Sequence, residues 1–167
     1  MRRRNWLAIA LATVAMMFSY FPYAAAFADS DGESGTINMG LVAIGLAVAP
    51  FVFVLLGFVS ANKAAPRRVM QSMVLLPLVG LGVGLLSPAV GATAAFGVGA
   101  ALCLNPPDAP YVYRWRMGAV VLTVVYTTIL LITVTPAGVF TGGLLPLMMV
   151  GFADEYLLWG AARARME

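Results

Sequence analysis

Long apolar stretches alternate with short basic clusters along the chain of 167 residues. The basic clusters lie at residues 2–4, 63–68, 114–116 and 163–165. The apolar stretches between them cover residues 5–62, 69–113 and 117–162. A transmembrane helix needs about 20 apolar residues, and each stretch is roughly twice that long. Each stretch therefore predicts a helical hairpin that crosses a membrane and returns.

Turn-forming residues divide each apolar stretch. They are the acidic segment 29–35, the pair Ser87-Pro88, and the segment 135–138, which contains Pro136 and Gly138. Pro and Gly commonly interrupt helices, and the apolar runs do not alternate as strands of a barrel would. We predict an all-α polytopic membrane protein, with a single transmembrane domain over residues 1–167 and six spans arranged as three hairpins. The spans are expected at about 5–28, 37–61, 69–86, 89–104, 117–135 and 139–160.

The basic clusters also predict the orientation. Lys and Arg in short loops remain on the cytoplasmic side of the membrane, so both termini and all four clusters are expected in the cytoplasm. The N-terminal segment has a second interpretation, because Arg2–Arg4, an apolar run and Ala26-Phe27-Ala28 resemble a secretory signal peptide with its cleavage site. Cleavage there would leave five spans, and we favour retention of residues 1–28 as the first span.

Composition supports the membrane assignment and narrows the chemistry. The chain is 62% hydrophobic and 10% charged, whereas a soluble domain has about 25% charged residues. This excludes a soluble enzyme and a disordered tail. The chain has no His and one Cys, which excludes metal or haem sites built on His, Cys–His catalysis and a disulfide framework. We expect a non-enzyme without catalytic, cofactor-binding or metal-binding residues.

Small residues at helical spacing predict where helices pack closely. Helices in a bilayer associate through small residues four positions apart. Gly80 and Gly84 have this spacing in the third span, and Gly91, Ala95 and Gly99 have it in the fourth. We expect these two spans to cross closely at the five positions, with the nearby Cys103 as a structural residue on the same face.

Two adjacent acids, Asp154 and Glu155, lie near the cytoplasmic end of the last predicted span. Charged groups within a bilayer are costly and are functional candidates by default. Tyr156, Trp159 and the basic cluster at 163–165 follow, which favours a position at the membrane interface. We predict a structural ion-pair clasp with arginines of neighbouring loops. The candidate partners are Arg67, Arg68, Arg114 and Arg116.

The loop at 105–116 combines three prolines with aromatic and basic residues. Its prolines predict an extended segment. The candidate contact residues for a partner protein or for lipid are Tyr111, Tyr113, Arg114, Trp115 and Arg116. Such a strip can anchor at the headgroups, or it can dock a partner, since Tyr, Trp and Arg dominate binding hot spots.

These features favour a non-catalytic accessory or scaffolding subunit of a larger membrane assembly, such as an envelope lipid importer or a respiratory complex. The abundance of Ala, Gly and Arg is typical of a bacterial inner-membrane protein. Expected partners are other integral membrane subunits and lipids, and no nucleic acid. The alternative is a small secondary transporter or channel that acts as an oligomer, with Asp154 or Glu155 facing a cavity.

Overall fold

The computed structural model describes residues 2–28, 36–85 and 87–163, and this part of the chain is all-helical, as predicted. It forms six α-helices and no strand. The helices are α1 (Arg2–Ala28), α2 (Met39–Val54), α3 (Ala65–Gly84), α4 (Pro88–Cys103), α5 (Val112–Thr133) and α6 (Thr135–Arg163). A π-helical turn, η2 (Leu55–Val59), continues α2.

Four segments of the described chain are long and apolar enough to cross a membrane, which supports the assignment as a membrane protein. They are Arg3–Phe27, Met39–Val59, Val112–Thr133 and Thr135–Arg163. The third and fourth predicted spans differ: α4 is apolar but has 16 residues, and α3 includes Arg67 and Arg68 near its start. The count of six spans therefore stays a prediction.

The helix breaks agree with the sequence at one turn and differ at another. Between α3 and α4 the chain turns at Ser87, and Pro88 opens α4, as predicted. At the third turn, α6 begins at Thr135, so the predicted turn residues 135–138 form its first helical turn instead. Proline is tolerated there because the first N–H groups of a helix have no intrahelical partner. The first predicted turn, 29–35, lies outside the described residues.

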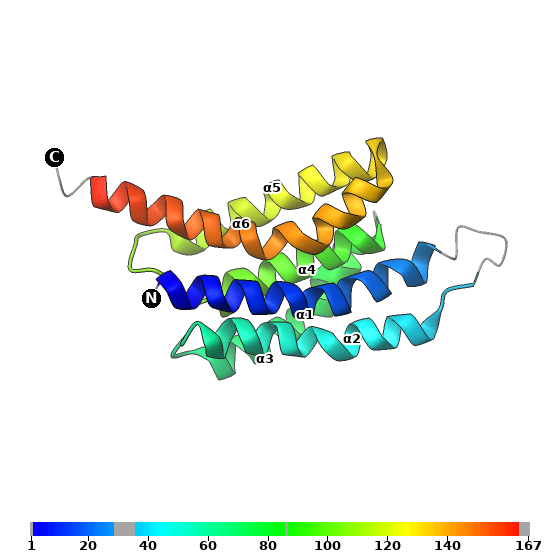
Figure 1. Ribbon diagram of the computed structural model, residues 1–167, viewed down its shortest axis with the longest axis horizontal. Coiled ribbons are helices and arrows are strands. Elements are labelled where there is room, and N and C mark those ends of the chain that lie inside the picture. The colour runs from blue at the N-terminus through cyan, green and yellow to red at the C-terminus, as the bar shows by residue number, and fades with distance from the viewer. Residues whose placement is uncertain (1, 29–35, 86, 164–167) are drawn as a thin grey trace.

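Consecutive helices pair as α1 with α2, α3 with α4, and α5 with α6, which gives the three predicted hairpins. Helix α4 lies at the centre and contacts all five other α-helices (Figure 1). Most of its residues are small, and twelve of its sixteen are buried. A helix made largely of Gly and Ala allows neighbours to approach on every side.

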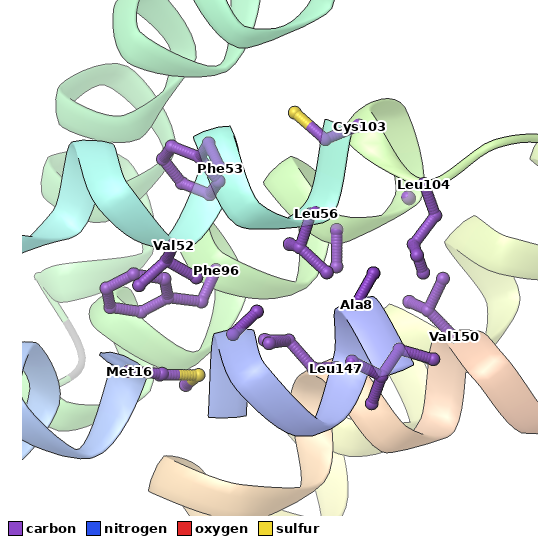
Figure 2. Packing of buried hydrophobic residues seen from close by; sticks show 14 of the residues in the cluster. Ala8, Met16, Val52, Phe53, Leu56, Phe96, Cys103, Leu104, Leu147 and Val150 are labelled. Carbon is purple, nitrogen blue, oxygen red and sulfur yellow. The ribbon is translucent and has the colours of Figure 1, made fainter. Parts of the chain in front are cut away.

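The core joins side chains of α1, α2, η2, α4, α5 and α6, and Figure 2 shows part of it. In Figure 2, Met16 of α1, Phe53 of α2 and Phe96 of α4 lie at one side of the cluster, and Leu147 and Val150 of α6 lie at the other. The rings of Phe53 and Phe96 are 5.8 Å apart. Helix α1 contributes much of this core, so a form of the protein cleaved after Ala28 would lose those core side chains.

One end of the bundle gathers the basic residues. The start of α1, the α2–α3 turn, the α4–α5 loop and the end of α6 all lie at the left of Figure 1. These are the positions of the basic clusters in the described sequence. We call this the basic end.

Candidate functional site

The site centres on the C-terminal end of α4, at the basic end of the bundle. With 16 residues, α4 is about 24 Å long at 1.5 Å per residue, shorter than the roughly 30 Å hydrocarbon core of a bilayer. Its last residue, Cys103, and the residue that follows it, Leu104, are fully buried. The final carbonyls of a helix have no intrahelical donor, and lipid supplies none. These carbonyls therefore need donors from elsewhere in the protein.

Arg116 of α5 supplies most of those donors. Its Nη1 donates to the carbonyls of Ala101 at 2.8 Å and Leu104 at 3.0 Å, and its Nη2 donates to that of Asn105 at 3.2 Å. Its Nε and Nη2 donate to the two carboxylate oxygens of Asp154, each at 2.7 Å. All five guanidinium N–H groups are thus engaged, and the side chain is fully buried.

Asp154 of α6 balances the charge of Arg116. The pair has the two-pronged geometry that makes Arg–carboxylate contacts strong, and the Asp154 side chain is 7% exposed. The C-terminus of a helix also carries a partial negative charge that favours a cation. The pair therefore fastens α5 and α6 to the end of α4.

Three further polar residues complete this cluster, and sequence reasoning missed all of them. Asn62 donates to the carbonyl of Cys103 at 2.8 Å, and Asn5 to that of Asn105 at 2.9 Å. The Ser60 hydroxyl accepts from the N–H of Asn105 at 3.1 Å. One signal was present in the sequence: the fourth span is too short to reach the interface, which implies buried carbonyls at its end.

The remaining clasp candidates have other contacts. Glu155 accepts a hydrogen bond from the indole N–H of Trp6 at 3.1 Å. Arg68 donates to Gln71 and to the Tyr113 hydroxyl, at 3.3 and 3.2 Å. Of the four candidate arginines, Arg116 forms the ion pair with Asp154, and among the described residues Arg67 and Arg114 form none with either acid.

The predicted aromatic strip is divided by the start of α5. Tyr111 lies just before the helix, and Tyr113, Arg114, Trp115 and Arg116 lie within it, so the extended conformation predicted for 105–116 is wrong over its last five residues. Tyr113 turns toward Arg68, whereas Trp115 contacts the Tyr156 ring at 5.2 Å. Arg114 lies over the Tyr111 ring at 5.5 Å. Because Arg116 is buried, it has no surface for an external contact.

The predicted small-residue positions meet at two different contacts. A β-carbon on Gly91 would lie 2.7 Å from the Cα of Gly84 and would also meet the Gly80 carbonyl oxygen, and one on Gly80 would lie 3.9 Å from Ala95. These four residues thus line the contact of α3 and α4. Gly99 instead faces the Phe53 ring of α2.

Cys103 is a buried free cysteine on the α3 side of α4. Its sulfur lies 3.2 Å from the Ser72 hydroxyl. This contact holds the end of α4 against α3.

Buried hydroxyls gather in the interior at the contact of α1, α4, α5 and α6. Thr93 donates to the carbonyls of Ala89 at 2.9 Å and Gly142 at 3.3 Å. The Tyr20 hydroxyl approaches Thr93 without the geometry of a hydrogen bond, and Thr127 also has no partner in the described chain. A β-carbon on Gly142 would meet the Tyr20 hydroxyl, so this glycine makes room for the tyrosine.

The surface of the described chain has two larger openings, and a small one of about 30 Å³ lies beside Asp154 and Glu155. A groove of about 950 Å³ runs along α5 and α6 near the basic end, past Arg114, Trp115 and Tyr156. A smaller apolar cleft of about 390 Å³ separates α1 and α2 from α3 and α4. No group of three metal-ligating residues occurs in the described ranges. The polar cluster can neutralise the partial negative charge at the C-terminal end of α4 and hold that end against α5 and α6.

Compared with known proteins, the chain matches no family model, no curated protein and no solved structure.

Proposed function

We propose that this chain is a non-catalytic accessory subunit of a larger assembly in a bacterial inner membrane. The observation that carries the proposal is the state of its buried charges. All five N–H groups of Arg116 are used within the chain, on both carboxylate oxygens of Asp154 and on the carbonyls of Ala101, Leu104 and Asn105. A transporter would need Asp154 for coupling, and the contacts with Arg116 favour a structural role for this acid instead.

The proposed topology has six spans with both termini in the cytoplasm. It is supported by the common location of the basic clusters at one end of the bundle and by the retention of positive loops on the cytoplasmic side. The short helix α4 then crosses among the other helices, with the more exposed α3 beside it, and Arg116 closes its basic end.

Cysteine labelling tests this topology in a Cys103→Ser background. Lys63 is exposed at the basic end, and Leu85 is 89% exposed at the opposite end. In intact cells, a membrane-impermeant maleimide should label Leu85→Cys and leave Lys63→Cys unlabelled until the cells are permeabilised. Labelling of Lys63→Cys from outside would overturn the proposed orientation.

The apolar cleft between the first two hairpins is where we place a partner's transmembrane helix. Its accessible walls include the half-buried Gly80 of α3 and Ala92 of α4, whereas Gly45 and Ala49 of α2, which also line it, are already buried inside the chain. Small residues allow the backbones of neighbouring helices to approach closely. Leu81 lies at the edge of this cleft and is 72% exposed.

Photo-crosslinking from the cleft tests the subunit hypothesis. With a benzophenone amino acid at Leu81, we expect one crosslinked product of defined mass in native membranes. The same partner should co-purify in constant ratio in a mild detergent. The control is Ile129 of α5, which is 54% exposed outside both openings and should give only lipid adducts. Purification as a lone monomer, with no protein adduct from Leu81, would refute the proposal.

A further inference from the structure

The groove on α5 and α6 has a floor of small residues. Gly118 and Ala119 of α5 and Ala153 of α6 line it, between the larger Leu122 and Phe152. No atom lies within 4 Å of where a Gly118 β-carbon would be. The two helices pack side by side along this face, so the small residues leave a trough between them that is open to the surrounding lipid.

A free cation stands at the mouth of this trough. Arg114 is exposed and lies over the Tyr111 ring. The carboxylate of Asp154 is bound by Arg116, and no ion pair of Arg114 occurs in the described residues. Three arginines thus behave differently: Arg116 is saturated, Arg68 bonds Tyr113, and Arg114 faces outward.

The dimensions of the trough match one leaflet of a membrane. Arg114 and Leu122 are eight residues apart on α5, about 12 Å along the helix, and one leaflet contributes about half of the roughly 30 Å hydrocarbon core. The rings of Trp115 and Tyr156, which contact each other at a tilt of 43°, line the groove together with Arg114. Aromatic rings of this kind favour the level of the headgroups.

We propose that this groove binds one anionic phospholipid, with its phosphate on Arg114 and one acyl chain along Gly118, Ala119 and Ala153. The positive mouth selects an anionic headgroup, and the apolar trough takes the chain. Arg114 lies at the basic end, where the proposed topology places the cytoplasmic leaflet, which is rich in anionic lipid. The site is complete within a single chain, so it does not depend on a partner subunit.

Fluorescence of Trp115 tests the proposal directly. The variant Trp6→Phe/Trp159→Phe keeps Trp115 as its single tryptophan, since the chain has three. Two preparations of phosphatidylcholine nanodiscs are compared. One contains phosphatidylglycerol with brominated acyl chains, and the other contains the same fraction of phosphatidylcholine with brominated acyl chains. We expect the brominated phosphatidylglycerol to quench Trp115 several-fold more strongly than the brominated phosphatidylcholine.

Two further substitutions separate the headgroup from the chain. Arg114→Gln should abolish the difference between the lipids, and Gly118→Leu should reduce quenching by both. Arg163→Gln is the control, because Arg163 is also exposed at the basic end but does not line the groove; it should leave the difference unchanged. Equal quenching by both lipids would show an ordinary annular contact and overturn the proposal. Weak quenching by both would show a groove covered by a second copy and would also overturn it.

Native mass spectrometry provides a second measurement on the unsubstituted chain, should the tryptophan variant fail to fold. After exchange into mixed phosphatidylglycerol and phosphatidylcholine, we expect one retained phosphatidylglycerol per chain and its loss in Arg114→Gln. Equal retention of the two lipids, or retention unaffected by Arg114→Gln, would contradict the site.

Discussion

Replacing Asp154 by Ala should destabilise the helical bundle by about 3–5 kcal/mol, because it leaves the Arg116 guanidinium buried without its counter-charge. The cost comes from an unpaired buried charge rather than from the loss of a favourable surface contact, which would be worth about 0–1 kcal/mol. The measurement is the free energy of unfolding in mixed micelles as the fraction of SDS rises.

Matched variants show whether the geometry or the charge alone matters. Arg116→Lys keeps the charge, but its ammonium has three donors and lacks the planar fork, so it should recover little of the stability lost in Arg116→Ala. Arg114→Ala removes an exposed arginine two residues away and should change the free energy of unfolding by no more than about 0.5 kcal/mol.

The double variant Arg116→Met/Asp154→Leu removes both buried charges. Its free energy of unfolding should lie between those of the unsubstituted protein and Asp154→Ala. Recovery stays incomplete because the carbonyl of Ala101 loses its arginine donor and that of Leu104 keeps only Asn62, at 3.4 Å. An unsatisfied buried carbonyl costs about 1–3 kcal/mol.

The same acid separates the subunit hypothesis from the transporter alternative. Asp154→Asn should lower stability and weaken association with a partner, while any transport by the whole assembly remains measurable. If Asp154→Asn folds and assembles normally but abolishes a proton- or ion-coupled flux in liposomes, the structural role is wrong and the transporter hypothesis replaces it.

The sequence predicted the type of contact at the basic end but not the residue that makes it. Four arginines were candidate ion-pair partners of Asp154 and Glu155, because all of them lie at the basic end. At 3.6 residues per turn, Arg114 and Arg116 point in directions about 200° apart. Which of them turns inward depends on the rotation of α5 about its axis, and tertiary packing sets that rotation.

The hairpins themselves were predictable because their signals are local. The pair Ser87-Pro88 interrupts the apolar stretch in which it lies. The basic clusters indicate which ends of the helices lie on one side, whatever the packing between the helices. The contact of Gly99 depends instead on where α2 crosses α4, and no spacing within α4 encodes that crossing. The polar residues Asn5 and Asn62 escaped notice for the same reason, since their acceptors are 100 and 41 residues away in sequence.

Gly91 is the position where an added methyl group should do most harm between α3 and α4. Its β-carbon would lie 2.7 Å from the Cα and 2.8 Å from the N of Gly84, and it would also meet the Gly80 carbonyl oxygen. All three atoms belong to the α3 backbone, so no side-chain rotation relieves the contact. The two helices must move apart, and α4 has neighbours on its other sides that resist this movement.

We therefore expect Gly91→Ala to lower the free energy of unfolding by about 1–3 kcal/mol, the usual cost of overpacking, and Gly91→Leu to lower it further. Gly82→Leu is the matched control, because no atom lies within 4 Å of its β-carbon position and it points away from α4. Gly84→Ala should be milder than Gly91→Ala, since its β-carbon would lie 4.0 Å from the Gly91 Cα. SDS unfolding of the four variants checks the order. Equal tolerance of Gly91→Leu and Gly82→Leu would show that the close approach of α3 and α4 does not contribute to stability, and the small residues there would then reflect composition alone.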